Sequence, residues 1–130
     1  DLGTATTFDC VSAAGEFLGG VIAPGLAVSA DALCNSTARL PRVEFDVPSR
    51  ALATNTVQAL QSGLVYGYAG LVDGIVRRLK AEMGGDVKVI VTGGLASTIA
   101  KVTDTVDCVD NMLTLDGLKI LYDLNEAAND

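Results

Sequence analysis

The N-terminal part of the chain has the pattern of a β-hairpin followed by a helix. Residues 4–12 and 16–23 are rich in side chains that favour strands, and Ala13-Ala14-Gly15 lies between them, so we expect two antiparallel strands. Pro24-Gly25 then turns the chain into a segment rich in Ala and Leu. This segment predicts a helix over about residues 26–38 that ends before the next proline.

The longest pattern in the chain is helical and runs from Asn55 to about Met83, where Gly84-Gly85 ends it. One face of this helix is apolar and is expected to pack on the core; it comprises Leu60, Leu64, Tyr68, Leu71, Ile75 and Leu79. A second, narrow face begins at Thr56 and Ala59 and continues through four glycines. These glycines are Gly63, Gly67, Gly70 and Gly74.

Glycine inside a helix costs about 1 kcal/mol relative to Ala, so the glycine face needs a compensating contact. Close approach of another backbone is the expected compensation, and a kinked or interrupted helix is the alternative.

Shorter elements are expected on both sides of the long helix. Segment 40–54 contains two prolines and is expected to be irregular, with at most a short edge strand at 43–46. The C-terminal elements are predicted as a buried parallel strand at 87–91, a tight turn at 92–94, a helix at about 95–102, a strand near 105–109 and a helix at about 115–125 with Thr114 as its N-cap.

Composition and charge limit the function classes. A chain of 130 residues with 49% hydrophobic residues is long enough for one compact α/β domain. The formal net charge of −7 argues against binding to nucleic acid or to an anionic membrane, and no apolar run approaches the roughly 18 residues of a membrane span.

The cysteines and the N-terminal segment bear on location and metal binding. Three unclustered cysteines without a charged-then-apolar leader before them predict reduced thiols in a cytoplasmic protein. With no histidine and no close cysteine pair, a zinc-type centre is not expected.

The first nine residues have the composition of a phosphate-binding turn. Asp1 offers a hard carboxylate for a cation, Gly3 allows close approach of a ligand to the backbone, and Thr4 adds a hydroxyl donor. Gly93-Gly94, some 90 residues later, has the same backbone freedom after a predicted strand. The alternatives are an ordinary hairpin turn, a plain glycine turn and, for Asp1, a solvated chain end.

Six stretches extend this interpretation over nearly the whole chain. Their sequences are DLGTATTFD (1–9), GEFLGGVIAPGL (15–26), LPRVEF (40–45), NTVQALQSGLVYGY (55–68), VTGGLA (91–96) and LTLDGL (113–118). In sequence and order they resemble the C-terminal half of type III pantothenate kinases, members of the superfamily of acetate and sugar kinases, heat-shock ATPases and actin.

The resemblance implies an α/β domain of the ribonuclease H-like (actin-like ATPase) kind, with a mixed β-sheet flanked by helices and one long helix at about 55–83. Residues 1–130 would form the C-terminal domain of a two-domain kinase whose N-terminal domain is absent from this chain. The full-length enzyme would phosphorylate pantothenate to 4'-phosphopantothenate with ATP, the first step of coenzyme A biosynthesis. The family pattern also has an apolar strand leading into Asp1.

The resemblance also implies roles for particular residues. Thr4 and Gly3 would contact ATP phosphates, and the Gly93-Gly94 turn would border the adenosine. Thr56 would contact pantothenate, and Asp1 would be associated with a monovalent cation, K⁺ or NH₄⁺, beside the Mg²⁺ that accompanies ATP.

The catalytic aspartate of the family lies upstream, so no catalytic residue is expected in 1–130 and the isolated chain is expected to be inactive. Such enzymes are homodimers. Two alternatives remain open: another small-molecule kinase of the same superfamily, and a non-catalytic regulatory homologue.

Overall fold

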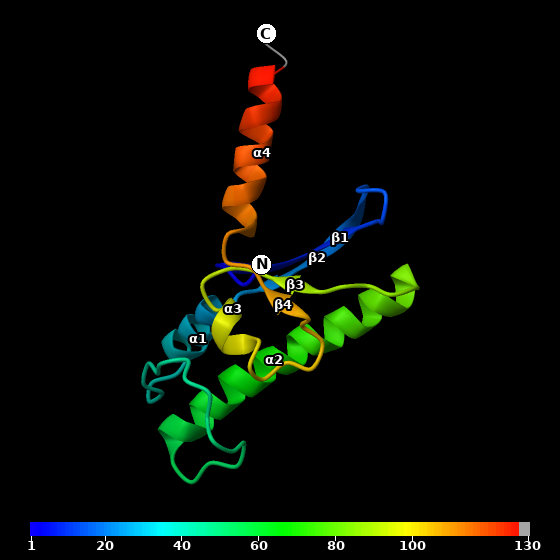
Figure 1. Ribbon diagram of the computed structural model, residues 1–130. Helices are drawn as coiled ribbons and strands as arrows, with labels where there is room; N and C mark the ends of the chain where they lie inside the picture. Colours follow the sequence, from blue (N-terminus) through cyan, green and yellow to red (C-terminus); the bar gives the residue numbers. More distant parts are fainter. Residues whose placement is uncertain (128–130) are drawn as a thin grey trace.

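The computed structural model describes residues 1–127 and shows a mixed α/β chain with two small sheets (Figure 1). The first sheet pairs β1 (Ala5–Val11) with β2 (Phe17–Pro24) in antiparallel orientation, which confirms the predicted hairpin. Helix α1 (Leu26–Asn35) follows directly and is shorter than expected, because the chain leaves the helix at Ser36.

Helix α2 (Thr56–Met83) has the predicted length and the predicted ends. The side chain of Asn55 caps its start by accepting a hydrogen bond from the Gln58 N–H at 3.0 Å. Gly84 ends it with a φ of 68°, a conformation that glycine adopts without strain.

The core-facing side of α2 was predicted only in part. Leu60 and Tyr68 are buried as expected, whereas Leu64, Leu71, Ile75 and Leu79 are only partly buried. The face that reaches the core is centred on valines that share one helical stripe, namely Val65, Val72 and Val76. The larger leucines flank this stripe and pack against the edge of the core.

The glycine face of α2 is open in this chain. A β-carbon at Gly63, Gly67 or Gly70 would meet no atom within 4 Å, and one at Gly74 would meet only the flexible end of Arg78 at 3.8 Å. The helix is unbroken, which excludes an interruption at the glycines. The described residues therefore do not supply the expected backbone contact, and the contact of this face with another backbone stays a prediction.

The expected edge strand at 43–46 was wrong, since residues 40–54 form neither strand nor helix. Side chains of α2 bind the carbonyls of this segment instead. Gln61 donates to the Glu44 carbonyl at 3.1 Å, Ser62 to Ala51 at 2.6 Å and Tyr66 to Pro48 at 2.6 Å. These bonds satisfy three carbonyls of the segment without a partner strand.

The second sheet is parallel and pairs β3 (Ile90–Val91) with β4 (Cys108–Val109), both shorter than predicted. Helix α3 (Ala96–Ile99) connects them in a single turn. The single mixed sheet that the resemblance implied is thus represented by two separate pairs of strands, while the mixed α/β class is confirmed.

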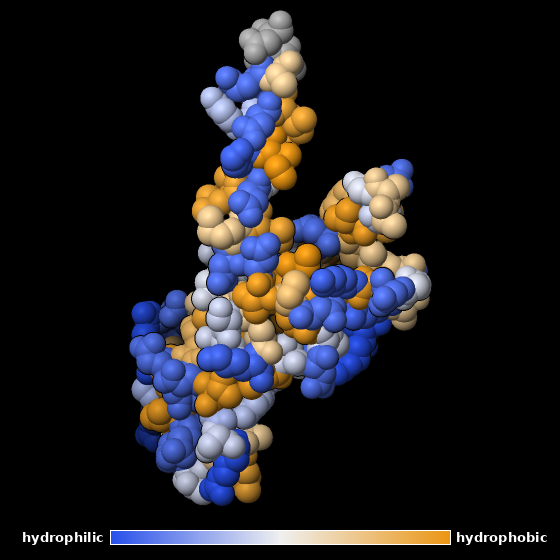
Figure 2. Space-filling model, in the orientation of Figure 1, coloured by the Kyte–Doolittle hydropathy of each residue, from blue (hydrophilic) through white to orange (hydrophobic). Residues whose placement is uncertain are grey.

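Helix α4 (Leu113–Ala127) projects away from the remainder of the molecule (Figure 1). Thr114 lies inside this helix, so its assignment as the N-cap was wrong; the Asp110 carboxylate accepts the Met112 N–H at 2.9 Å and the helix starts earlier. No residue of α4 is buried, and its apolar side chains are visible along it in Figure 2. Of the helices in the described part of the chain, none is long and apolar enough to cross a bilayer.

Candidate functional site

The N-terminal turn is fixed by main-chain hydrogen bonds to three parts of the fold. Leu2, only 3% exposed, donates to the Thr92 carbonyl at 2.8 Å. The Thr7 N–H donates to the Asp1 carbonyl at 3.0 Å, and the Gly25 N–H donates to the Thr4 carbonyl at 3.1 Å. The turn is therefore held against β1, the start of α1 and the segment after β3.

Gly93 makes the closest approach to this turn. Its φ is +103°, and a β-carbon there would lie 2.7 Å from both Asp1 Oδ1 and the Leu2 nitrogen. Only glycine fits such a position, in conformation and in space. The two glycine-containing motifs, far apart in the sequence, are thus in direct contact.

The two motifs border a shared hollow of about 480 Å³. Apart from glycine, every residue that lines it carries a side-chain oxygen. The lining comprises Asp1, Thr92, Gly93, Gly94, Ser97, Asn111 and Thr114. Such a surface suits a polar, anionic ligand held by hydroxyls, an amide and backbone N–H groups.

The hollow offers one carboxylate, and the described residues contain no cluster of three or more His, Cys, Asp or Glu that would hold a metal by protein ligands alone. Hard oxygen donors of this kind fit Mg²⁺ or K⁺ when phosphate oxygens complete the coordination. Helix α3 has only four residues, so backbone N–H groups would contribute more here than a helix dipole.

The structure brings some predicted site residues together and leaves others apart. Gly3 lies beside Asp1, since a β-carbon added at Gly3 would be 3.2 Å from Asp1 Oδ1. Thr4 is exposed on the same turn but does not line the hollow. Thr56 is the exposed first residue of α2 and also lies outside the hollow.

A buried hydroxyl pair behind the turn was not predicted. Thr6 is completely buried, and its Oγ1 lies 2.5 Å from the Tyr68 hydroxyl and 3.2 Å from the Pro24 carbonyl. Because Thr6 has one hydroxyl hydrogen, which the Pro24 carbonyl accepts, Tyr68 donates to Thr6. Burial raises the pKa of Tyr68, so β1 and α2 are joined by a neutral pair.

Asp73 is a second buried polar residue that the sequence did not single out. Its carboxylate accepts hydrogen bonds from the Asp104 and Thr105 N–H groups at 3.0–3.1 Å and from the Thr105 hydroxyl at 2.7 Å. Burial favours a raised pKa, but these bonds and the Arg77 guanidinium outweigh it and hold the pKa of Asp73 below its ordinary value. The signal available in the sequence was an isolated acid between core valines of a helix.

The family model and the curated relatives that match this chain name one family. A family model described as type III pantothenate kinase matches residues 1–78. Proteins named type III pantothenate kinase from Koribacter versatilis and Anaeromyxobacter sp. are 56% and 58% identical over 98% and 96% of this chain. The chain covers 46% and 49% of those proteins, and so spans about half the length of the curated relatives it matches.

One solved structure is also similar to this chain. The crystal structure of a conserved putative Baf family transcriptional activator from Campylobacter jejuni matches 96% of this chain and 56% of that chain, with a TM-score of 0.64 and 26% sequence identity.

Proposed function

Since this chain belongs to the type III pantothenate kinase family, we propose that it forms the C-terminal, actin-like ATPase domain of an enzyme that phosphorylates pantothenate. The enzyme transfers the γ-phosphoryl group of ATP to the primary hydroxyl of pantothenate and so begins coenzyme A biosynthesis. A ribonuclease H-like arrangement, a cytoplasmic location and a homodimer belong to the same proposal.

One observation carries this proposal: Asp1, Gly93 and Gly94 border one hollow lined by oxygen-bearing side chains, and Gly3 lies directly beside Asp1. Kinases need such surfaces because phosphoryl transfer depends on positioning the phosphates and neutralising their charge. The glycines let phosphate and adenosine approach the backbone, and the Thr4 hydroxyl, on the same turn but outside the hollow, donates to a phosphate oxygen in this proposal.

Cations supply the positive charge that this acidic chain lacks. In the proposal Asp1 holds K⁺ or NH₄⁺, and Mg²⁺ enters with ATP. The exposed carboxylate of Asp1 beside the Gly93 backbone supports this assignment.

The remaining parts of the enzyme lie outside this chain. The aspartate that takes the proton from the pantothenate hydroxyl, and the first phosphate loop, belong to the half of the relatives that this chain does not cover. Thr56 contacts pantothenate in this proposal, from a position separate from the hollow. Residues 1–130 alone are therefore inactive.

A non-catalytic regulatory role is the second candidate, and the name of the Campylobacter jejuni protein favours it. The net charge of −7 argues against direct contact with nucleic acid in that role. Another small-molecule kinase of the superfamily is the third candidate.

The test is a chimera in which this chain replaces the equivalent half of the Koribacter versatilis pantothenate kinase. ATP-dependent formation of 4'-phosphopantothenate is measured for the chimera, for that kinase and for residues 1–130 alone. The chimera is expected to be active and the isolated chain inactive.

Asp1→Asn in the active chimera should weaken activation by K⁺ or NH₄⁺ more than it weakens pantothenate binding. A folded chimera without activity would favour the regulatory alternative, and a chimera active only on another hydroxyl compound would favour the third candidate. An unchanged cation dependence in the Asp1→Asn chimera would remove Asp1 from the site.

A further inference from the structure

The oxygen-lined hollow lies where two parallel strands end. Val91 of β3 is opposite Val109 of β4, and the Asp110 N–H donates to the Val91 carbonyl at 2.9 Å. The segments that follow the two strands therefore lie next to each other, and both line the hollow. Ligands of α/β sheets typically bind outside the carboxyl ends of parallel strands.

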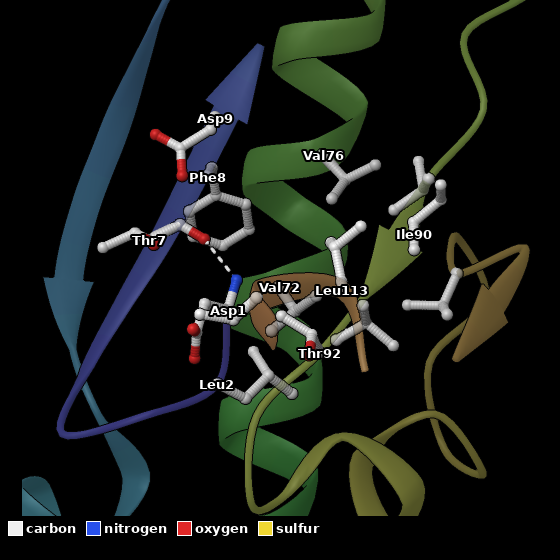
Figure 3. A pocket seen from close by; sticks show the side chains of 14 residues that line it. Asp1, Leu2, Thr7, Phe8, Asp9, Val72, Val76, Ile90, Thr92 and Leu113 are labelled. Atoms are coloured by element: carbon white, nitrogen blue, oxygen red, sulfur yellow. Dashed lines mark hydrogen bonds between the residues drawn. The ribbon is translucent and has the colours of Figure 1, made fainter. Parts of the chain in front are cut away.

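The first turn of α4 is directed to the same place. Leu113 lines a separate cavity of about 260 Å³ together with Val72 and Val76 of α2 (Figure 3). The next residue, Thr114, lines the hollow. The start of α4 thus contributes a hydroxyl group to the hollow, although the helix as a whole has no buried residue.

Thr92 contributes a second, buried hydroxyl. Its side chain lines the hollow and is only 7% exposed, and its carbonyl accepts the Leu2 N–H at 2.8 Å. Within residues 1–127, the Thr92 hydroxyl has no hydrogen-bond partner. A buried hydroxyl without a partner costs free energy, so its position at the hollow points to a ligand that bonds to it.

Asn111 presents the most versatile group in the hollow. The turn that carries it is closed by Asp110, whose carboxylate accepts the Met112 N–H at 2.9 Å. The Asn111 side chain is exposed, and no described residue makes a hydrogen bond to its amide. Because an amide carries an acceptor and two donors side by side, it can accept a hydrogen bond from one hydroxyl and donate to its neighbour.

The charge around Asn111 favours an uncharged part of a ligand. The residues that line the hollow include no Lys or Arg, and Asp1, the one ionisable side chain among them, lies against Gly93. Asp110 adds a second carboxylate next to Asn111 in the chain. A phosphate beside Asn111 would meet carboxylates without a cation from the lining residues, whereas sugar hydroxyls carry no charge.

We propose that Asn111 is a specificity-determining residue that binds the neighbouring 2′- and 3′-hydroxyls of the nucleotide ribose. The hydroxyls of Thr92 and Thr114 complete this end of the hollow, and the phosphates extend toward Asp1. The identity of the ligand rests on the proposed function. The inference adds the part of ATP that is bound here and the side chain that selects a ribonucleotide over a deoxyribonucleotide.

Binding of uncharged nucleosides tests this role without phosphates or cations. Adenosine, 2′-deoxyadenosine and 3′-deoxyadenosine are titrated into the isotope-labelled chain, and NMR shifts of the Gly94 and Asn111 amides give the dissociation constants. The variants are Asn111→Ala, which removes the amide group, and Asn111→Asp, which keeps acceptors that can bind ribose hydroxyls. Asn35→Ala, at the exposed end of α1, is the control.

The original chain and Asn35→Ala are expected to bind adenosine about three- to tenfold more tightly than either deoxynucleoside, as one lost hydrogen bond predicts. Asn111→Ala should bind all three nucleosides alike, with the affinity that the original chain has for the deoxynucleosides. Asn111→Asp should keep the preference for adenosine. An unchanged preference in Asn111→Ala, no preference in the original chain, or no binding of adenosine would each overturn the proposal.

The chimera assay separates this inference from the proposed function. In an active chimera, Asn111→Ala should raise the KM for ATP and leave kcat unchanged, because ribose binding is equal in the ground state and the transition state. An inactive chimera together with Asn111-dependent binding of adenosine would contradict the kinase and support the ribose site. An active chimera whose preference for ATP over 2′-deoxyATP survives Asn111→Ala would support the kinase and contradict the ribose site.

Discussion

Replacement of Gly93 by alanine is the most direct test of the contact between the two glycine motifs. Gly93 has a φ of +103°, which alanine rarely adopts, and such backbone strain costs about 1–3 kcal/mol. The new methyl group would also lie 2.7 Å from the Leu2 nitrogen and 2.8 Å from the Leu2 carbonyl carbon, which are main-chain atoms that cannot rotate away. Overpacking of this kind typically costs a further 1–3 kcal/mol, roughly.

The expected loss in the free energy of unfolding is therefore about 2–6 kcal/mol, a large share of the roughly 5–15 kcal/mol of a typical domain. Gly94→Ala is the matched control, because Gly94 has no positive φ and a β-carbon there meets nothing within 4 Å. Urea unfolding followed by far-UV circular dichroism measures both variants, since the chain has no tryptophan. A Gly93→Ala protein within about 0.5 kcal/mol of Gly94→Ala would refute the close packing of Gly93 against Leu2.

Three further predictions concern other parts of the chain. Asp73→Asn should lower the free energy of unfolding at neutral pH by about 1.5–3 kcal/mol. Because the pKa of Asp73 is depressed in the folded state, the stabilisation from its carboxylate is present above the ordinary pKa of 3.8 and is lost as pH falls through the folded-state pKa. The thermal midpoints of the original protein and the Asp73→Asn variant should therefore converge in acid. Gly67→Ala should raise the stability of the monomeric chain by about 1 kcal/mol but lower it by about 1–3 kcal/mol where a second copy covers the helix, which unfolding at several protein concentrations distinguishes. In the active chimera, Thr4→Val should raise the KM for ATP and Thr56→Val the KM for pantothenate, each by about tenfold or more, and exchanged effects would reverse the two assignments.

The sequence predicted those helices and strands whose ends are marked by turn or capping residues within the element's own segment. The hairpin and α2 were predicted almost to the residue, because the former has a turn between strand-forming runs and the latter has Asn55 and Gly84 at its ends. Local sequence patterns gave wrong secondary structure where contacts between distant residues determine the backbone conformation. The 43–46 segment looks like an edge strand, but α2 side chains bind the neighbouring carbonyls.

The candidate site shows the same division. The two glycine-containing motifs indicated that Gly3 and Gly93 belong to a binding site, and the structure places both beside Asp1. The bonds that hold this arrangement, such as the one between Thr6 and Tyr68, join residues far apart in sequence and leave no local pattern. The sequence also could not predict that Thr56 lies apart from the hollow, because this depends on the direction in which α2 runs.

Helix α4 has a consequence for how the chain behaves in solution. At 15 residues it has the length at which an isolated helix is only marginally stable in water, and none of its residues is buried. Its helix–coil equilibrium therefore lacks the tertiary support that α2 has, and α4 is expected to be the first helix to fray on warming. Any surface that covers its leucines will shift that equilibrium, so a gain in helical content on mixing reports the covering event itself.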